Sequence, residues 1–394
     1  MPTDLTEPTP RTVMLVCGEP SGDQLGAELM ARLKSVDTDI RIVGVGGAAM
    51  AAQGLNSLFP LDDTAVMGLR EVVPRIPAIL RRVREASGYA LAVKPDALVL
   101  IDSPDFTHRI AQRVKRLDPS IRTVNYVAPQ VWASRQYRAR KMARYFDLVL
   151  ALLPFEVPFF HRYGLRAEFV GHPVIERVSR MVGGDALRSR LGISPNARIL
   201  VLLPGSRMNE VRLLLPRFRE AAAIIARAIS DVVCLLPTVP HVQDFVRENT
   251  RDWPLALHIL EGEPDKFAAF KAADVALAAS GTVTTELALA RTPMVAAYRL
   301  GWLTYTLARP FISVRFVTLV NLLLERGAVP ELIQRACTGP ALASAVLDFL
   351  GNGDLRERQR EALDEATKKL GIGGAAPSQR AADALLAFIW EPNR

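Results

Sequence analysis

Short apolar runs of strand length alternate along this chain with longer segments whose apolar residues recur at helical spacing. The runs at residues 97–101 and 199–203 are wholly apolar, as in strands that are buried on both faces of a parallel sheet. We predict strands at residues 12–17, 41–45, 97–101, 123–127, 148–153, 168–170, 199–203, 232–236, 256–260, 275–278 and 294–297. Strands that alternate with helices at this spacing predict an α/β fold with helices on both faces of each sheet.

Two domains are expected because 394 residues exceed what one hydrophobic core usually holds. A polar stretch with Gly183-Gly184 and Ser194-Pro195 separates two sets of strands, and we interpret residues 181–196 as a linker. The sequence therefore predicts two doubly wound, Rossmann-like domains with a cleft between them, at residues 1–180 and 197–345. Helices are expected over residues 346–394. They could pack back on the first domain or swap between the subunits of a homodimer, and the sequence leaves both open.

Composition narrows the class of protein. Apolar residues make up 49% of the chain and charged residues 23%, which is ordinary for a globular protein. Cys17, Cys234 and Cys337 lie too far apart for a metal-binding cluster, and their odd number favours a reducing compartment. The first ten residues do not resemble a signal peptide, and no window of 18 apolar residues is free of charge. Any membrane contact is therefore expected to be peripheral.

The net charge of +8 is unevenly distributed along the chain. Residues 135–144 hold five basic side chains and no acidic one, and residues 70–84 hold five arginines and one glutamate. Such clusters fit a nucleic acid, an anionic membrane surface or a phosphorylated substrate, and a solvated helix face is as common an explanation.

The stretch at residues 202–210 joins a buried strand to the start of an amphipathic helix through Pro204 and Gly205. Ser206 or Asn209 is expected to cap this helix. The free N–H groups at the start of a helix suit phosphate, and so does the forked guanidinium of Arg207. We interpret this stretch as the seat of a nucleotide diphosphate. An ordinary turn with a solvated arginine is the alternative.

Residues 279–286 repeat the design of strand, glycine and helix. The hydroxyl and N–H groups of Ser280, Gly281 and Thr282 could hold a second phosphate. Glu286, one turn into the helix, is placed to accept hydrogen bonds from the hydroxyls of a ribose. Two such helix starts in one domain indicate a phosphate-binding site more specifically than either one alone.

Carboxylates follow two strands of the first domain. After the first strand, Glu19 and Asp23 could bind sugar hydroxyls or act as bases, although Ser21 or Asp23 could equally cap the next helix. After the third strand, Asp102 suits a general base that takes a proton from an alcohol, and Asp105 is expected to cap the following helix.

Signatures of other cofactors are weak or absent. Residues 44–49 fit the glycine pattern of a nicotinamide-binding turn, but they follow the second strand and precede a short helix. The sequence contains no Walker A pattern, no HExxH and no pair of CxxC motifs. We predict no metal and no cofactor.

A series of motifs runs in order from about residue 12 to about residue 335. They are Cys17-Gly-Glu-Pro-Ser-Gly-Asp23, Ala65-Val-Met-Gly68, Ile101-Asp-Ser-Pro-Asp-Phe106, Tyr126-Val-Ala-Pro-Gln-Val-Trp-Ala133, Leu153-Pro-Phe-Glu156, Gly171-His-Pro173, Leu203-Pro-Gly-Ser-Arg207 with Glu210, Ala279-Ser-Gly-Thr282 with Glu286, and Asn321-Leu-Leu with Glu331-Leu-Ile-Gln334. These motifs resemble those of the lipid-A-disaccharide synthases, a family of inverting glycosyltransferases with the GT-B architecture.

The resemblance implies a reaction and a role for each matching residue. It implies transfer of 2,3-diacylglucosamine from UDP to 2,3-diacylglucosamine 1-phosphate, which gives a β-1,6-linked disaccharide 1-phosphate and UDP. Asp102 matches the general base, Arg207 the residue essential for the nucleotide, and Glu19 a further catalytic position. The predicted site for the UDP-sugar comprises Ser206, Arg207, Glu210, Ser280, Gly281, Thr282, Glu286, Asn321 and Gln334. The resemblance also implies a cytoplasmic enzyme, peripheral on the inner face of the cytoplasmic membrane, that binds no nucleic acid.

Two questions stay open. Apolar residues and arginines interleave over residues 66–84, which fits a helix on an anionic lipid surface and, nearly as well, a helix packed on the sheet. The basic cluster at residues 135–144 could instead meet the acceptor phosphate. A UDP-N-acetylglucosamine 2-epimerase or a two-lobed binding protein could also use this architecture, because the fold alone does not fix the function.

Overall fold

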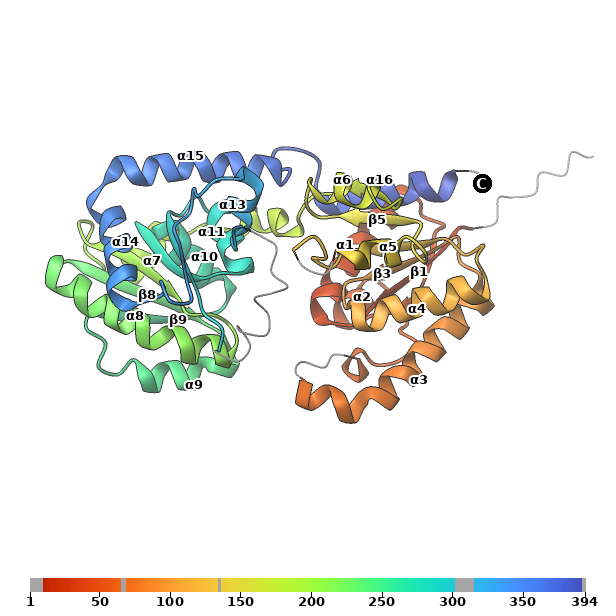
Figure 1. Cartoon of the computed structure of the whole chain (residues 1–394), viewed down its shortest axis with the longest axis horizontal. Coiled ribbons are helices and arrows are strands. Elements are labelled where there is room, and N and C mark those ends of the chain that lie inside the picture. Colours follow the sequence, from red (N-terminus) through yellow and green to blue (C-terminus); the bar gives the residue numbers. More distant parts are fainter. Residues whose placement is uncertain (1–9, 65–68, 134–135, 302–314, 392–394) are drawn as a thin grey trace, which may run out of the picture. The chain divides into compact units, whose positions relative to one another are not determined.

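The structure is a computed structural model that describes residues 10–64, 69–133, 136–301 and 315–391 (Figure 1). The chain forms two compact units, one made of residues 1–173 and 374–394 and the other of residues 174–373. Each unit contains one parallel sheet of six strands, so the predicted α/β class with two doubly wound sheets is confirmed. Of the helices in the described residues, none has the length and apolar content needed to cross a membrane.

The sheet of the first unit has the strand order β2-β1-β3-β4-β5-β6. The strands are β1 (Thr12–Cys17), β2 (Arg41–Val45), β3 (Ala97–Ile101), β4 (Thr123–Tyr126), β5 (Leu148–Ala151) and β6 (Arg166–Phe169). The helices are α1 (Pro20–Val36), α2 (Ala48–Ala52), α3 (Leu69–Val93), α4 (Pro104–Leu117), α5 (Tyr137–Met142), α6 (Glu156–His161) and the C-terminal α16 (Pro377–Trp390), with a 3₁₀ turn η1 at Leu61–Asp63.

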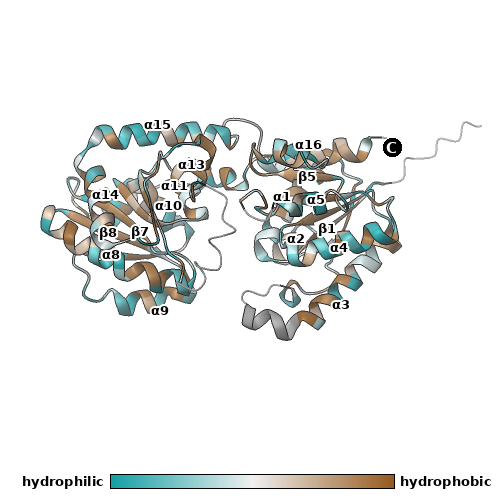
Figure 2. Ribbon diagram, viewed as in Figure 1, coloured by the Kyte–Doolittle hydropathy of each residue, from teal (hydrophilic) through white to brown (hydrophobic). Residues whose placement is uncertain are grey.

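Strand β1 divides the core of this unit. Val13, Leu15 and Cys17 belong to the apolar cluster formed with α1 and α16, whereas Met14 and Val16 belong to the cluster formed with α3 and α4. Successive side chains of a strand point to opposite faces of the sheet, so helices on both faces bury every residue of β1 after Thr12. Figure 2 shows the same arrangement, with brown strands inside and teal residues on the outer faces of the helices.

The sheet of the second unit has the strand order β12-β11-β10-β7-β8-β9. The strands are β7 (Arg198–Leu203), β8 (Val232–Thr238), β9 (Ala256–Glu261), β10 (Val275–Ala279), β11 (Met294–Tyr298) and β12 (Glu331–Ile333). The helices are α7 (Gly184–Arg190), α8 (Met208–Ala228), α9 (Pro240–Asn249), α10 (Glu263–Ala272), α11 (Thr282–Leu289), α13 (Leu319–Leu324), α14 (Gly339–Gly351) and α15 (Gly353–Lys369). Phe218 of α8 and Val346 of α14 share one apolar cluster with Leu202 of β7.

Three expectations about the chain need correction. Residues 181–196 are not a bare linker, because they contain α7, which packs on α10 within the second unit. The division between the units falls earlier, at residues 173 and 174, within the 3₁₀ helix η2 (Pro173–Arg180). Strand β4 ends at Tyr126, since Val127 has a left-handed backbone with a φ of 69°. Strand β12 was not predicted, because its three residues are half-buried and form no apolar run.

The arginine-rich segment forms helix α3, whose side chains are described from residue 76 onward. Val83 and Ala86 are buried against α4, so this part of the helix packs on the unit. Arg82 pairs with Asp63 at 2.5 Å and with Glu85 at 2.6 Å, and it is therefore a structural residue. Val66, Met67 and the motif at residues 65–68 lie outside the described residues.

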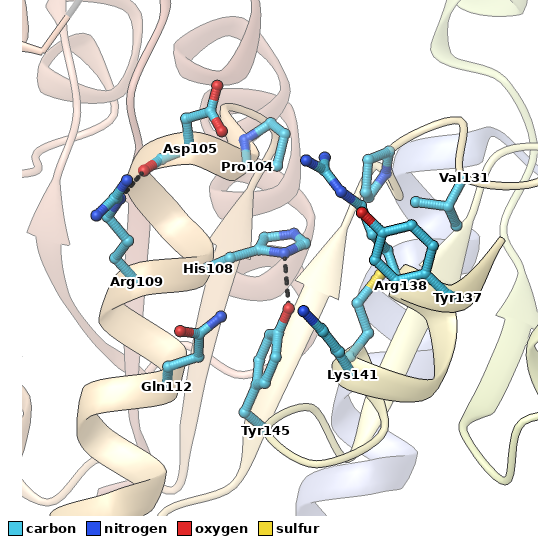
Figure 3. A pocket seen from close by; sticks show the side chains of 12 residues that line it. Pro104, Asp105, His108, Arg109, Gln112, Val131, Tyr137, Arg138, Lys141 and Tyr145 are labelled. Atoms are coloured by element: carbon cyan, nitrogen blue, oxygen red, sulfur yellow. Dashed lines mark hydrogen bonds between the residues drawn. The ribbon is translucent and has the colours of Figure 1, made fainter. Parts of the chain in front are cut away.

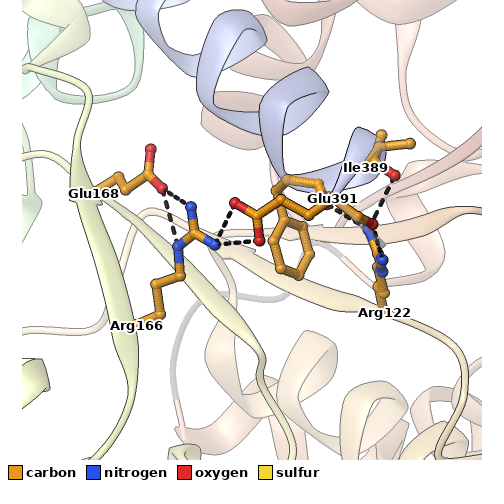
Figure 4. Close-up of polar contacts among 6 residues, drawn as sticks. Arg122, Arg166, Glu168, Ile389 and Glu391 are labelled. Carbon is orange, nitrogen blue, oxygen red and sulfur yellow. Dashed lines mark hydrogen bonds and ion pairs between the residues drawn. The ribbon is translucent and has the colours of Figure 1, made fainter. Parts of the chain in front are cut away.

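The C-terminal helix α16 returns to the first unit and packs against α1. Two arginines hold its end (Figure 4). Arg122 donates hydrogen bonds to the carbonyl oxygens of Phe388, Ile389 and Glu391, and Arg166 pairs with the Glu391 carboxylate at 2.7 Å. The last carbonyl groups of a helix lack hydrogen-bond donors within the helix, and here the guanidinium of Arg122 donates to them.

Asp23 joins the first helix of the chain to the second. It is buried, and its carboxylate accepts hydrogen bonds from the backbone N–H groups of Gly47, Ala49 and Met50 at 2.7, 2.8 and 3.0 Å. These N–H groups belong to the first turn of α2, where an anion also interacts favourably with the helix dipole. Asp23 is thus a cap, but for α2 rather than for the helix that contains it. Two N–H groups of the glycine pattern at residues 44–49, those of Gly47 and Ala49, therefore donate to a side chain of this chain.

We expect Asp23→Ala to lower the free energy of unfolding of the first unit by about 2–3 kcal/mol, because three N–H groups of α2 lose their acceptor. Urea denaturation followed by circular dichroism measures this change. Asp39→Ala is the control, since Asp39 is exposed on the turn before β2 and is expected to change stability little. Equal losses in the two variants would contradict the capping role.

Candidate active site

The second unit has a cavity of about 550 Å³ at the carboxyl ends of its strands. Its walls are the loops that follow β7, β8, β9 and β10 together with the first turns of α8, α10 and α11. Of the residues predicted for the UDP-sugar, seven line this cavity: Ser206, Arg207, Glu210, Ser280, Gly281, Thr282 and Glu286. In a doubly wound sheet a ligand is expected at this edge.

The loop after β7 turns sharply at Gly205. The φ of Gly205 is +118°, and a Cβ atom there would lie 2.6 Å from the Cβ atom of Glu210, so only glycine fits. The residue that precedes α8 is Arg207, and not Ser206 or Asn209 as the sequence suggested. The Glu210 carboxylate accepts a hydrogen bond from the Arg207 backbone N–H at 3.4 Å and pairs with its guanidinium at 3.2 Å. The guanidinium remains largely exposed and can turn toward a ligand.

Two further contacts shape the loops around the cavity. His241 donates a hydrogen bond from Nε2 to the carbonyl oxygen of Ser206 at 2.6 Å, which ties the loop after β7 to α9. The hydroxyl of Ser280 donates to the carbonyl oxygen of Val317 at 3.1 Å. The Ser280 hydroxyl proton is therefore used within the protein, whereas the N–H groups at the start of α11 can still donate to an anion.

Glu286 is buried between two cations. Its carboxylate pairs with Lys266 Nζ at 3.0 Å and with Arg177 Nη1 at 3.0 Å. Two opposite charges compensate a carboxylate that has lost its water. Sequence reasoning missed both partners. Lys266 lies one turn into α10, after a strand that we predicted, and could have been found as a basic residue near a strand end.

Asn321 and Gln334 do not line this cavity. Asn321 is buried, and its side chain is committed to hydrogen bonds with the backbone of Val329 and with the Glu331 carboxylate, each at 2.8 Å. Gln334 has a left-handed backbone with a φ of 53°, and its carbonyl oxygen accepts a hydrogen bond from Arg299 at 3.1 Å. In this structure both residues hold the chain around β12, and their predicted contact with the UDP-sugar stays a prediction.

Asp102 follows β3 in the first unit on a constrained backbone. Asp102 and Ser103 have consecutive φ values of 52° and 44°, a conformation that costs about 1–3 kcal/mol for each residue. Ser103, and not Asp105, precedes α4. The half-buried carboxylate of Asp102 accepts a hydrogen bond from Ser21 at 3.3 Å, and its carbonyl oxygen accepts one from Thr107 at 2.6 Å.

The loop that carries Glu19 lies beside the loop that carries Asp102. Strands β1 and β3 pair in register, with Cys17 opposite Ile101, so the loops after them begin side by side. Gly18 makes this approach close, because a Cβ atom there would lie 2.8 Å from the Cβ atom of Ser103. The predicted catalytic residues of the first unit therefore share one edge of its sheet, and a sugar hydroxyl could reach both loops.

Comparison with known sequences identifies the family. A family model described as lipid-A-disaccharide synthetase matches residues 13–384. The lipid-A-disaccharide synthase of Rhodospirillum centenum is 47% identical over 381 residues, which cover 96% of this chain and 95% of that protein. The corresponding protein of Paramagnetospirillum magneticum is 44% identical over 380 residues, or 96% of this chain and 97% of that one. The chain belongs to the lipid-A-disaccharide synthase family.

Solved structures agree on the fold. A putative UDP-N-acetylglucosamine 2-epimerase from Listeria monocytogenes aligns over 96% of both chains with a TM-score of 0.64 and 14% identity. The MurG protein of Acinetobacter baumannii aligns over 96% of this chain and 100% of its own with a TM-score of 0.57 and 16% identity. At such identities the likeness shows the GT-B fold alone. The predicted glycosyltransferase of lipid A biosynthesis is therefore confirmed by the family, and the epimerase alternative has only a distant fold similarity.

Trp132 and Glu156, which belong to two of the motifs, contact each other in the first unit. No role was predicted for either residue from the sequence. Trp132 Nε1 donates a hydrogen bond to the Glu156 carboxylate at 3.0 Å, and the Leu153 backbone N–H donates to it at 3.0 Å. Glu156 is buried, and burial raises the pKa of its carboxyl group to about 7. This contact fixes the loop after β4 against the loop after β5.

We expect the stability of the first unit to depend on the protonation of Glu156. The pKa is higher in the folded protein than in the unfolded chain, so this stabilisation is full below about pH 4.5 and is lost as the pH rises through about 7. Relative to Glu156→Gln, the wild-type protein should lose up to about 3 kcal/mol between these limits. Urea denaturation at about pH 5 and about pH 8 measures the difference, with Asp39→Asn as control because Asp39 is exposed. A difference that does not change with pH would contradict the shifted pKa.

Proposed function

We propose how the residues of this lipid-A-disaccharide synthase share the reaction. The cavity of the second unit holds the UDP part of the donor, and the loops after β1 and β3 hold the acceptor sugar. The observation that carries this assignment is the cavity itself, where the starts of two helices, α8 and α11, meet Arg207 and Lys266. The reaction joins the two substrates, so it requires both units to engage them together.

The charge of the leaving diphosphate is the main charge that the enzyme must stabilise during the reaction. As the bond between the anomeric carbon and UDP breaks, negative charge develops on the diphosphate. The N–H groups at the starts of α8 and α11 are aligned donors for it, and the exposed Arg207 supplies a full positive charge. Glu286 is held in place by Lys266 and Arg177, and we assign it to the ribose hydroxyls.

Asp102 is the base in this proposal. The 6-hydroxyl of the acceptor gives its proton to the Asp102 carboxylate as its oxygen bonds to the anomeric carbon from the face opposite UDP. The oxygen–carbon bond to UDP breaks in the same step, which inverts the configuration. The left-handed backbone at Asp102 and Ser103 fixes the direction of the carboxylate. Glu19, on the neighbouring loop, is assigned to the acceptor hydroxyls.

We expect Asp102→Asn to lower kcat for disaccharide formation by about 10²–10⁴, because the acceptor hydroxyl loses its base. Its affinity for UDP should stay at the wild-type value. Mass spectrometry of the disaccharide in detergent micelles, together with UDP release, measures turnover, and calorimetry measures UDP binding.

Arg207→Ala is the complementary variant in that experiment, with weakened UDP binding as its expected defect, and Asp39→Asn is the inert control. Wild-type turnover in Asp102→Asn would refute the assignment of the base. UDP release without disaccharide in the wild-type protein would point to hydrolysis or to an epimerase-like reaction.

The acyl chains of both substrates require contact with a lipid surface. We propose that the enzyme is cytoplasmic and binds peripherally to the inner face of the cytoplasmic membrane through helix α3. Ile76, Arg81 and Arg84 are exposed on this helix, which supports the proposal, whereas Arg82 is neutralised by Asp63 and Glu85. Assembly into a homodimer stays a prediction, which the mass of the protein in solution would test.

We expect the double variant Arg81→Glu with Arg84→Glu to partition at least tenfold more weakly onto anionic liposomes, since each basic residue near such a surface contributes about 1 kcal/mol. Sedimentation with vesicles that contain anionic phospholipid measures this partition. The double variant Arg227→Glu with Arg251→Glu, at exposed positions of the other unit, makes the same change in net charge and is the control. Unchanged partition of the double variant would exclude this surface of α3.

A further inference from the structure

The first unit has a polar cavity that the mechanism above does not use. It measures about 350 Å³ and lies between α4, α5 and the loop after β4 (Figure 3). Pro104 and Asp105, at the start of α4, form one wall, and they lie two and three residues after Asp102 in the chain. The opposite wall carries Arg138 and Lys141.

The charge of this cavity is mostly positive. Arg138 and Lys141 are three residues apart on α5 and therefore lie on one side of that helix. Both are exposed, and neither forms a salt bridge within the described part of the chain. Arg109 adds a third cation, bound through Nε to the carbonyl oxygen of Asp105 at 2.8 Å. Asp105 contributes the one carboxylate among the lining residues, so an anion is the complementary ligand.

A buried histidine adds an unused hydrogen-bonding atom. Figure 3 shows the imidazole of His108 projecting from α4 toward Tyr145 and Arg138. Nδ1 lies 3.1 Å from the Tyr145 hydroxyl, while the buried Nε2 has no partner in the described part of the chain. Burial and the charge of Arg138 lower the pKa of His108 to about 4, so the ring is neutral at neutral pH. When the Tyr145 hydroxyl donates to Nδ1, Nε2 carries the proton and is a donor without an acceptor.

We propose that this cavity binds the phosphate monoester of the acceptor sugar. The forked guanidinium of Arg138 and the ammonium of Lys141 suit a phosphate dianion, and an oxygen acceptor near His108 would pair with the donor that has no partner among the described residues. The assignment rests on the proposed function, in which the acceptor carries a 1-phosphate. Its 1-phosphate is on C1 and its 6-hydroxyl is carried by C5 through C6, and these two ring carbons flank the ring oxygen. A base and a phosphate site must therefore lie close together, and Asp102 and this cavity lie on neighbouring segments.

The loop after β4 is held firmly enough to form such a site. Val131 lines the cavity, and the next residue, Trp132, is bound to the buried Glu156 at 3.0 Å. On the other side, the Asp102–Ser103 backbone sets the start of α4 and with it the direction of His108. The cations Arg138 and Lys141 are exposed, whereas His108 and Tyr145 are held in the wall of the cavity by the contact between them.

Binding of soluble phosphates to the full chain tests this site without requiring turnover. We expect inorganic phosphate and glucosamine 1-phosphate to bind in calorimetry, and glucosamine to bind far more weakly. Arg138→Ala and Lys141→Ala should each weaken the binding of both phosphates roughly tenfold or more, as for the loss of a charge-assisted hydrogen bond. Arg140→Ala is the matched control, because Arg140 is exposed on the same helix but does not line the cavity. Wild-type affinity in both lining variants would overturn the proposal.

Kinetics with the lipid substrates identify the source of the phosphate. If it belongs to the acceptor, Arg138→Ala raises the KM for 2,3-diacylglucosamine 1-phosphate about tenfold or more, while kcat and the KM for the UDP-sugar stay unchanged. Loss of phosphate binding with an unchanged acceptor KM would overturn the acceptor assignment and leave free phosphate as the ligand. A wild-type protein that binds glucosamine 1-phosphate through Arg138 but forms no disaccharide would support the site and contradict the proposed function.

Discussion

The burial of both faces of each parallel sheet is the constraint from which the rest of this structure follows. Strands β1, β3, β7 and β10 are apolar and buried except for the residues that begin β1 and β7, Thr12 and Arg198. Polar and charged groups are therefore placed at the ends of these strands. All the strands run in one direction within each sheet, which collects the ends of neighbouring strands at one edge. The candidate catalytic and binding groups lie there because that edge is where the fold admits them.

At these edges the protein must also compensate charges that it removes from water. The buried side chains of Glu286 and Glu156 are compensated in two different ways. Glu286 keeps two cations, Lys266 and Arg177, within 3.0 Å of its carboxylate. Glu156 has no such cation among the described residues, and instead accepts hydrogen bonds from Trp132 and Leu153, while burial raises the pKa of its carboxyl group. The first arrangement fixes a negative charge beside the candidate nucleotide cavity, and the second allows a carboxyl group to lose its charge near neutral pH.

The sequence predicted the strands well and the ends of helices poorly, for physical reasons. A strand buried on both faces is a continuous apolar run, and such a run is visible without any knowledge of contacts. Strand β12 has half-buried residues and leaves no such trace. Capping depends on backbone conformation and on distant partners. The left-handed Ser103 precedes α4 in place of Asp105, and Asp23 caps α2, more than twenty residues away in the chain. The pair of Trp132 and Glu156, and the ion pairs of Glu286, depend likewise on tertiary packing that no local pattern encodes.

The two candidate phosphate sites place different demands on the protein. A diphosphate that gains charge during the reaction is best met by donors that do not move, and the N–H groups at the starts of α8 and α11 are fixed by their helices. An acceptor phosphate has the same charge before and after transfer, so it needs to be positioned but not stabilised further. Exposed side chains such as Arg138 and Lys141 can do this and still release the product. A neutral His108 and a Glu156 whose charge burial disfavours are compatible with such an anion, since neither adds a strong negative charge to that side of the unit.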